Sequence, residues 1–195
     1  MTFLIEDRDF DILDINMGCP VPKVVNNGEG SALLKNPNLI EEIVRKVSSA
    51  ISKPLTVKVR IGFENEPVDI VEIAKRIEDA GAAALAVHGR TRQQYYSGTA
   101  DWDTIRRVKE AITIPVIGNG DVDSPLKAEA LVKQTGCDAV MVGRAVRGNP
   151  WLFRELNHYF RTGELLERPS VEEIREMILR HARKQIELKG EFVGI

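Results

Sequence analysis

Short apolar runs alternate with helix-like segments along most of this chain, and this alternation most strongly limits how the chain can fold. The runs are rich in Val and Ile or closed by Gly, which is typical of strands buried on both faces of a sheet. Alternation of this kind predicts parallel strands joined by helical crossovers. The predicted strands are 12–16, 55–60, 84–88, 115–119 and 138–143.

Helical periodicity fills the intervals between the runs, because Leu, Ile and Val recur every three or four residues there. In the last interval, Ser124 and Pro125 predict a helix start and Gly136 predicts its end. The other predicted helices are 38–49, 68–80 and 102–111.

After residue 150 the alternation of strand-like and helix-like segments ends. Two helices are predicted there, over 151–160 and 171–188, and the second carries charges of both signs opposite an apolar stripe. We therefore divide the chain into a βα region, 1–150, and the start of an appended helical module, 151–195.

The βα unit recurs about every 32 residues, so eight units would approach the roughly 250 residues of a TIM (β/α)8 barrel. The same five units could form an open, doubly wound sheet, and counting leaves both folds open. The strand ends described below favour the barrel. We predict an α/β fold, a partial TIM barrel of about five βα units, with roughly three units absent from its front.

Composition excludes several classes of protein. The chain has 43% hydrophobic and 29% charged residues, which is ordinary for a soluble globular protein. The net charge of −2 argues against coating nucleic acid by bulk charge, while a local basic surface stays open. No apolar run approaches a membrane span. Cys19 and Cys137 form no disulfide framework or zinc motif, so we expect no metal, no membrane and a cytoplasmic location.

Polar or Gly-rich residues end all five predicted strands, where α/β folds place their chemistry. Lys58 and Arg60 lie two apart on the second strand and therefore share a face. Burying two cations costs free energy unless a negative charge lies close to them, and this predicts an anionic ligand. A surface edge strand with snorkelling side chains is the alternative.

The fourth and fifth strand ends combine glycines with Arg144. Backbone N–H groups at such turns, together with an Arg, make a phosphate cradle, and barrels often bind phosphate at their last two loops. A purely structural role for these glycines is the alternative. His88 ends the third strand, as a functional residue or as a satisfied core histidine.

Cys19 lies between the turn residues Gly18 and Pro20 at the end of the first strand. Thiols are mostly protonated at pH 7, so this side chain could donate a proton. The alternative is a small buried apolar side chain. Cys137 has no such setting, and we expect it in the core.

Taken together, these strand ends resemble the signatures of the tRNA-dihydrouridine synthases, in order and spacing, over about residues 10 to 160. The stretch 88–102 looks most like the bacterial B-type branch. The matching segments are Asn16-Met-Gly-Cys-Pro20, Lys58-Val-Arg-Ile-Gly62, His88-Gly-Arg-Thr-Arg92, Gly118-Asn-Gly-Asp121 and Val142-Gly-Arg-Ala145 followed by Gly148-Asn-Pro-Trp151.

The resemblance implies an FMN enzyme that reduces a uridine of tRNA to 5,6-dihydrouridine, with NADPH as the electron donor. Hydride would pass from flavin N5 to uracil C6, and a proton from Cys19 to C5. By the same resemblance, the flavin-ring residues are Lys58 and His88; the FMN residues on the phosphate side are Asn119, Gly120, Asp121, Gly143 and Arg144; and the substrate-pocket residues are Asn16 and Arg60, with Arg90 and Arg92 as contacts to the base or nearby phosphates.

The chain departs from the family at both ends. The family's first strand with its flavin-binding turn, an early flavin-contacting glutamine and most of the C-terminal tRNA-binding module are missing, which predicts a truncated chain. We therefore do not expect it to retain near-stoichiometric flavin by itself. An open sheet edge would invite self-association.

Three alternatives stay open. One is a flavin oxidoreductase similar to dihydroorotate dehydrogenase, and another is a flavin-free, phosphate-binding isomerase barrel. The third is an inactive fragment that binds RNA or a partner chain weakly.

Overall fold

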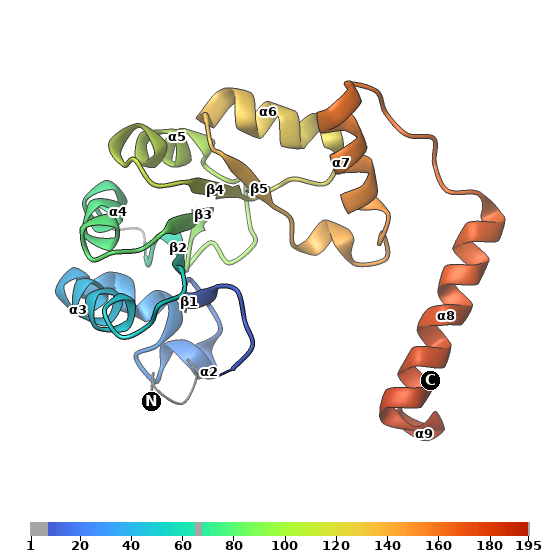
Figure 1. Cartoon of the computed structure of the whole chain (residues 1–195), viewed down its shortest axis with the longest axis horizontal. Helices are drawn as coiled ribbons and strands as arrows, with labels where there is room; N and C mark the ends of the chain where they lie inside the picture. The colour runs from blue at the N-terminus through green and yellow to red at the C-terminus, as the bar shows by residue number, and fades with distance from the viewer. Residues whose placement is uncertain (1–7, 65–67, 195) are drawn as a thin grey trace.

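The computed structural model describes residues 8–64 and 68–194, and strands and helices alternate along it as predicted (Figure 1). Each predicted strand and helix is present, with its ends shifted by a few residues, whereas the shortest helical elements were not predicted. In order, the elements are β1 (Leu13–Met17), α2 (Pro22–Val25), η1 (Gly30–Lys35), α3 (Pro37–Ser48), β2 (Leu55–Gly62), α4 (Ile70–Asp79), β3 (Ala84–Thr91), α5 (Trp102–Ala111), β4 (Val116–Asn119), α6 (Pro125–Thr135), β5 (Ala139–Met141), η2 (Arg144–Val146), α7 (Leu152–Thr162), α8 (Val171–Lys189) and α9 (Glu191–Gly194).

The strands of the described residues form one parallel sheet in the order β1-β2-β3-β4-β5. A doubly wound sheet reverses its strand order at a switch point, whereas a barrel adds each new strand beside the last. The sequential order therefore confirms the partial barrel. The register pairs Arg60 with His88 and His88 with Asn119, which brings these polar strand ends into one row.

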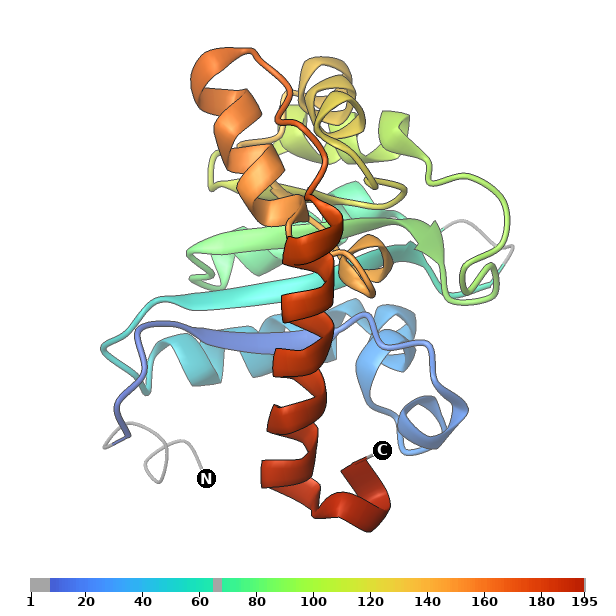
Figure 2. The ribbon, with the colours of Figure 1, turned by 90° about the vertical axis from the view of Figure 1, so that its right-hand side faces the viewer.

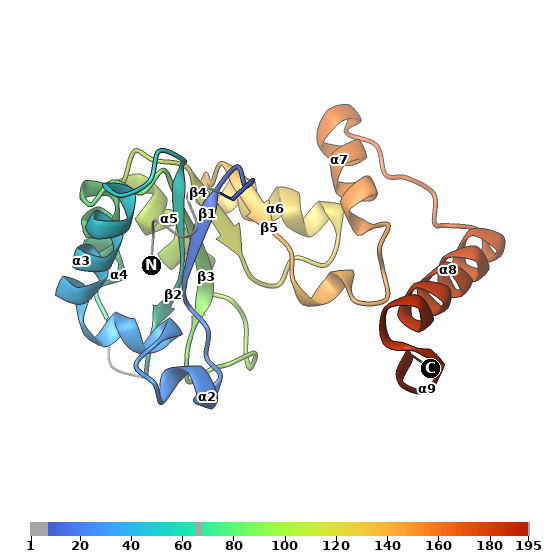
Figure 3. The ribbon, with the colours of Figure 1, turned by 60° about the horizontal axis from the view of Figure 1, so that its bottom comes forward.

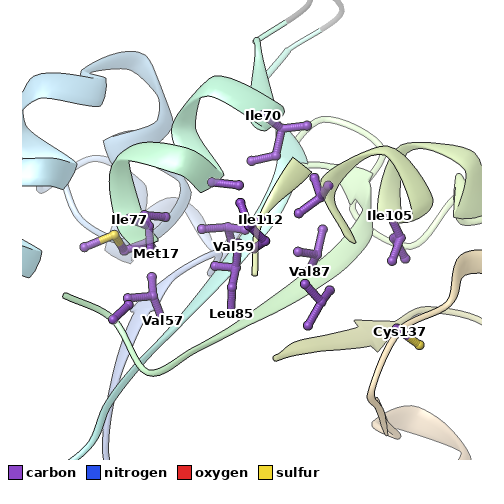
Figure 4. Packing of buried hydrophobic residues seen from close by; sticks show 14 of the residues in the cluster. Met17, Val57, Val59, Ile70, Ile77, Leu85, Val87, Ile105, Ile112 and Cys137 are labelled. Atoms are coloured by element: carbon purple, nitrogen blue, oxygen red, sulfur yellow. The ribbon is translucent and has the colours of Figure 1, made fainter. Parts of the chain in front are cut away.

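Helices α3 to α6 cover the outer face of this sheet, and apolar side chains fill the space between (Figures 1 and 4). Val57, Val59 and Val87 of the strands meet helix residues such as Ile77 and Ile105 in this core (Figure 4). Their burial is the main apolar contribution to stability. Cys137 belongs to the same cluster and is 3% exposed, which confirms its predicted place in the core.

Polar side chains fix where the covering helices begin. Each accepts a hydrogen bond from a backbone N–H of the first turn, which would otherwise lack a partner. Gly136 ends α6 in the left-handed conformation at φ 68°, so both predicted boundaries of that helix are confirmed. The capping residues are Asn36 for α3, Asp69 for α4, Asp101 for α5 and Ser124 for α6.

The inner face of the sheet is less well covered. Strand β1 exposes Asp14 and Asn16 there, and β5 exposes Ala139. The prediction that every strand is buried on both faces is therefore wrong for β1 and β5. The physical reason is that α3 to α6 pack on the opposite, outer face (Figure 1).

The chain continues beyond β5 into α7 and α8. Helix α7 packs on α6, and its Leu152 and Leu156 side chains are buried. Helix α8 stands apart from the sheet in Figures 1 and 3, although it crosses in front of it in Figure 2. Among the described residues, α8 contributes no buried side chain, and no helix is long and apolar enough to cross a membrane.

Candidate functional site

The carboxyl ends of the strands surround one cavity of about 970 Å³. The sequence predicted that polar strand ends would meet here, and the structure brings most of them together. The predicted site residues that line the cavity are Asn16, Cys19, Lys58, Arg60, His88, Asn119, Gly120, Asp121, Gly143 and Arg144.

Cys19 lies in a turn after β1 that hydrogen bonds hold in place. Asn16 Oδ1 accepts from the N–H groups of Gly18 and Cys19, both at 3.0 Å. The Cys19 carbonyl oxygen accepts from the Ser31 hydroxyl at 2.9 Å and from its N–H at 3.1 Å. Gly30, at φ 59°, passes so close that an added Cβ would lie 2.9 Å from that carbonyl oxygen. Strand β1 and η1 together therefore fix the thiol at the cavity wall.

Lys58 lies on β2, between β1 and β3, so the alternative of a surface edge strand does not hold. Burial lowers its pKa to about 8; the positive charge of Arg60 adds to this effect, and Asp14 opposes it. Among the described residues, Lys58 forms no ion pair. Below pH 8 it is therefore a half-buried cation that faces the cavity with no ion-pair partner among the described residues.

Arg60 is 3% exposed, and its guanidinium does not depend on the anionic ligand that we predicted. Its Nε donates to the Gly18 carbonyl oxygen at 2.9 Å, and its Nη1 donates to those of Thr91 at 3.0 Å and Tyr95 at 2.9 Å. Backbone carbonyls thus take the place of the expected anion for these donors. Arg60 both lines the cavity and links the turn after β1 to the end of β3 and the turn that follows it.

His88 is 7% exposed at the end of β3. Burial lowers its pKa to about 3, and the nearby positive charges of Arg60 and Lys58 reinforce that shift. Its imidazole is therefore neutral at physiological pH. Within the described chain it has no hydrogen-bond partner, which does not fit the alternative of a satisfied core histidine.

The end of β4 carries a tight, hydrogen-bonded turn. Asn119 Nδ2 donates to the Met141 carbonyl oxygen at 2.8 Å and links β4 to β5. Asp121 has a left-handed backbone at φ 60°, and its Oδ2 accepts from the Ala100 N–H at 2.6 Å. Burial alone would raise the pKa of Asp121, but this N–H and the Arg90 guanidinium outweigh it and lower the pKa.

Gly143 and Arg144 follow β5, and Arg144 is the first residue of the 3-10 turn η2. Arg144 Nη2 lies 3.4 Å from Asp121 Oδ1. The guanidinium carbon of Arg144 also lies 4.6 Å from the centre of the Tyr96 ring. The Arg144 side chain is half exposed, so its positive charge remains available to a ligand.

Two predicted substrate contacts lie elsewhere. Arg90 is 1% exposed and points into the protein, where backbone carbonyls and Asp121 enclose its guanidinium. The prediction that it contacts a base is corrected accordingly, because a substrate cannot reach an enclosed group. Arg92 lies outside the cavity lining, with its guanidinium carbon 5.3 Å from the centre of the Phe63 ring.

Tyr96 is a cavity residue that our sequence reasoning missed. Tyr96 is 45% exposed, and its ring centre lies 5.8 Å from the guanidinium carbon of Arg60 and 4.6 Å from that of Arg144. A signal was present in the sequence, because two adjacent tyrosines follow the polar end of β3 in an otherwise polar turn. Lys127 and Trp102 also line the cavity without having been predicted.

The arrangement favours a flat, anionic ligand. Lys58, Arg60 and Arg144 bring positive charge to the cavity, while the carboxylate of Asp121 is already paired with Arg90. Tyr96 adds an aromatic surface beside them. Among the described residues, no group of three or more His, Cys, Asp or Glu side chains could hold a metal ion.

Comparison with known proteins decides which family these features belong to. The sequence model of the dihydrouridine synthase (Dus) family matches residues 3–195. The chain belongs to the dihydrouridine synthase family. This confirms the resemblance in the strand-end motifs and favours this family over the dihydroorotate-dehydrogenase-like and isomerase alternatives.

Curated members of the family place the chain near its B branch. It is 49% identical to tRNA-dihydrouridine synthase B of Shewanella oneidensis, over 94% of this chain and 57% of that protein. It is 46% identical to the protein of the same name from Pseudomonas putida, over 94% of this chain and 55% of that protein. The chain thus spans somewhat more than half the length of these dihydrouridine synthases.

A solved chain from the Amycolatopsis orientalis BexX/CysO complex matches with a TM-score of 0.49 and 20% identity, over 86% of this chain and 64% of that chain.

Proposed function

We propose that this chain reduces a uridine of tRNA to 5,6-dihydrouridine, with FMN as the flavin and NADPH as the electron donor. Membership of the dihydrouridine synthase family and similarity to proteins named tRNA-dihydrouridine synthase B support this function. The observation that carries it is a single cavity that joins the Cys19 thiol to the cations Lys58 and Arg60.

The residues present fit FMN. A volume of about 970 Å³ lies at the upper end of the roughly 300–1,000 Å³ of small-molecule sites. Lys58 and His88 would lie toward the flavin ring. Lys58 supplies an unpaired cation there, which suits the negative charge that a reduced flavin carries.

The phosphate would lie toward the ends of β4 and β5. Turns that present backbone N–H groups beside an Arg bind phosphate well. Arg144 is half exposed at this end of the cavity, and its contact with Asp121 is a long one, at 3.4 Å. The residues that would hold this side of FMN are Asn119, Gly120, Asp121, Gly143 and Arg144.

The chain's own part in the reaction is a proton transfer. When bound, FMN supplies the hydride that uracil C6 receives. Cys19 donates its thiol proton to uracil C5, and the turn that Asn16 and Ser31 hold keeps the sulfur at the cavity wall. His88 is a poor proton donor here, because burial lowers its pKa to about 3 and keeps it as neutral imidazole, whose remaining N–H is a very weak acid.

The target base must leave its stack in the tRNA to reach this cavity. Asn16 and Arg60 line the cavity and would contact the base, while Arg92 would contact nearby phosphates from outside it. We propose that residues 1–150 form the flavin-binding region and that residues 151–195 begin a helical tRNA-binding region. Helix α8 exposes basic side chains suited to that role: Arg175, Arg180, Arg183 and Lys184.

A second candidate is a non-catalytic module that binds RNA or a partner chain weakly. The exposed inner face of β1 and β5 favours it, because uncovered sheet surface promotes association. The two functions differ in one measurable respect, since a binding module forms no dihydrouridine.

The test is a turnover assay of the chain with FMN, NADPH and an unmodified tRNA transcript. We expect Cys19→Ala to lower dihydrouridine formation by about 100-fold or more, with FMN affinity unchanged, because a positioned proton donor contributes that much. Cys137→Ala is the matched control, since it removes the core thiol instead. Undiminished turnover of Cys19→Ala would contradict the catalytic role, and absent turnover of the unaltered chain would favour the binding module.

A further inference from the structure

Residues 95–100 form one wall of the cavity, and the buried guanidinium of Arg90 binds this wall on the side away from the cavity. Arg90 Nε donates to the Ser97 carbonyl oxygen at 3.0 Å, and Nη2 donates to that of Gly98 at 2.5 Å. The same Nη2 lies 2.7 Å from Asp121 Oδ1 and 2.9 Å from Oδ2. Arg90 therefore links the segment after β3 to the turn after β4.

Further contacts fasten the same segment to both strand ends. Asp121 Oδ2 accepts from the Ala100 N–H at 2.6 Å. Asp101 donates its N–H to the Gly89 carbonyl oxygen at 2.6 Å, and Trp102 Nε1 donates to that of Gly120 at 3.2 Å. Hydrogen bonds thus hold residues 97–102 to the ends of β3 and β4. The Asp121 carboxylate takes part in two of these contacts, one with Arg90 and one with the Ala100 N–H.

Stability alone does not explain this arrangement. Arg90 Nη1 is buried and, among the described residues, has no hydrogen-bond partner, which costs free energy. Asp121 has a left-handed backbone that non-glycine residues rarely adopt. A buried ion pair is weak evidence of stabilisation even when all its donors are satisfied. What the ion pair does accomplish is to place two parts of the cavity lining relative to each other.

We propose that Arg90 is a positioning residue whose ion pair with Asp121 sets where Tyr96 and the β4 turn stand at the cavity. Arg90 itself is 1% exposed and does not line the cavity; it acts through residues 95–100 and through Asp121. That the ligand is FMN rests on the proposed function, whereas the placement of the wall does not.

The test uses the whole chain with Trp151→Phe, which leaves Trp102 as its one tryptophan. In this background we expect Arg90→Met to speed chymotryptic cleavage after Tyr95 and Tyr96 about tenfold, because local opening then exposes the segment. We expect Trp102 emission to move to longer wavelength. We expect the urea midpoint of unfolding to fall, because Asp121 and two backbone carbonyls lose a partner, but by less than a tenfold rise in cleavage through global unfolding would require. Arg106→Gln is the matched control, since it removes an exposed ion pair on α5 with Glu110.

Asp121→Asn provides a second variant in case Arg90→Met does not fold. It keeps the side-chain shape, so we expect the same faster cleavage and emission change, and the double variant should add nothing further. Cleavage and emission like those of the parent in both variants would overturn the proposal. A change that merely follows a lowered urea midpoint would overturn it too, since that is what a general loss of stability produces.

FMN titration then separates this proposal from the proposed function. We expect Arg90→Met to weaken FMN binding about fivefold or more relative to the parent, because a displaced wall loses part of its preorganisation. FMN affinity equal to that of the parent would contradict the positioning role. A parent that binds no FMN would contradict the proposed function, while cleavage and emission would still decide whether Arg90 positions the wall.

Discussion

At the residue scale, the site consists of ionisable groups that the fold holds away from their usual state. Burial lowers the pKa of Lys58 to about 8 and that of His88 to about 3. Perturbed groups of this kind gather at functional sites. The cavity therefore offers a cation and a neutral imidazole side by side at physiological pH.

His88 makes a testable contribution to acid stability. Its pKa is about 3 in the folded chain and about 6.5 in an unfolded one, so the unfolded state takes up a proton first as pH falls. The stability that neutral His88 provides is complete above pH 6.5 and is lost as pH falls toward 3, by at most about 1.4 kcal/mol per pH unit.

We expect His88→Gln to flatten this dependence. The measurement is the free energy of unfolding in urea between about pH 4 and pH 7. His181→Gln, on exposed α8, is the control and should keep the slope of the parent. A slope in His88→Gln equal to that of the parent would show that His88 titrates normally.

At the element scale, the sequence predicted much of what places the site. Apolar runs and caps such as Ser124 gave the strands and helices, because those signals are local. The different positions of Arg60 on β2, Arg90 on β3 and Arg92 just after β3 could not be predicted. Arg60 lines the cavity and Arg90 lies behind its wall because residues 91–98 fold back to present carbonyls, and that path is set by tertiary packing.

The contact between η1 and the turn after β1 gives another prediction at this scale. Gly30→Ala would place a Cβ 2.9 Å from the Cys19 carbonyl oxygen and 3.0 Å from its Cβ, so Cys19 and the start of η1 must shift apart. We expect the alkylation rate of Cys19 to change about threefold or more, because access controls thiol reactivity.

Gly28→Ala is the matched control for this change. Gly28 also has a positive φ, of 77°, but an added Cβ there meets nothing within 4 Å. Both variants therefore bear backbone strain, and Gly30→Ala alone of the two presses on Cys19. Equal alkylation rates in the two variants would contradict the idea that η1 positions the thiol.

At the scale of the whole molecule, the chain is an arc of parallel strands with helices on its outer face and its polar strand ends gathered at one edge (Figure 1). The inner faces of β1 and β5 are exposed, and self-association through this sheet stays a prediction. The cavity is nevertheless formed within this arc, since its lining comes from the ends of all five strands.

The measurement that tests the central claim most directly is a titration of the chain with FMN, followed by flavin fluorescence. We predict saturable binding that weakens about fivefold in Lys58→Met and in Arg144→Met and stays unchanged in Arg106→Gln. Affinity should also fall as pH rises through about 8, where Lys58 loses its charge, and Lys58→Met should lack that dependence. Absence of saturable binding, or equal affinity in all these variants, would contradict the assignment of the cavity to FMN.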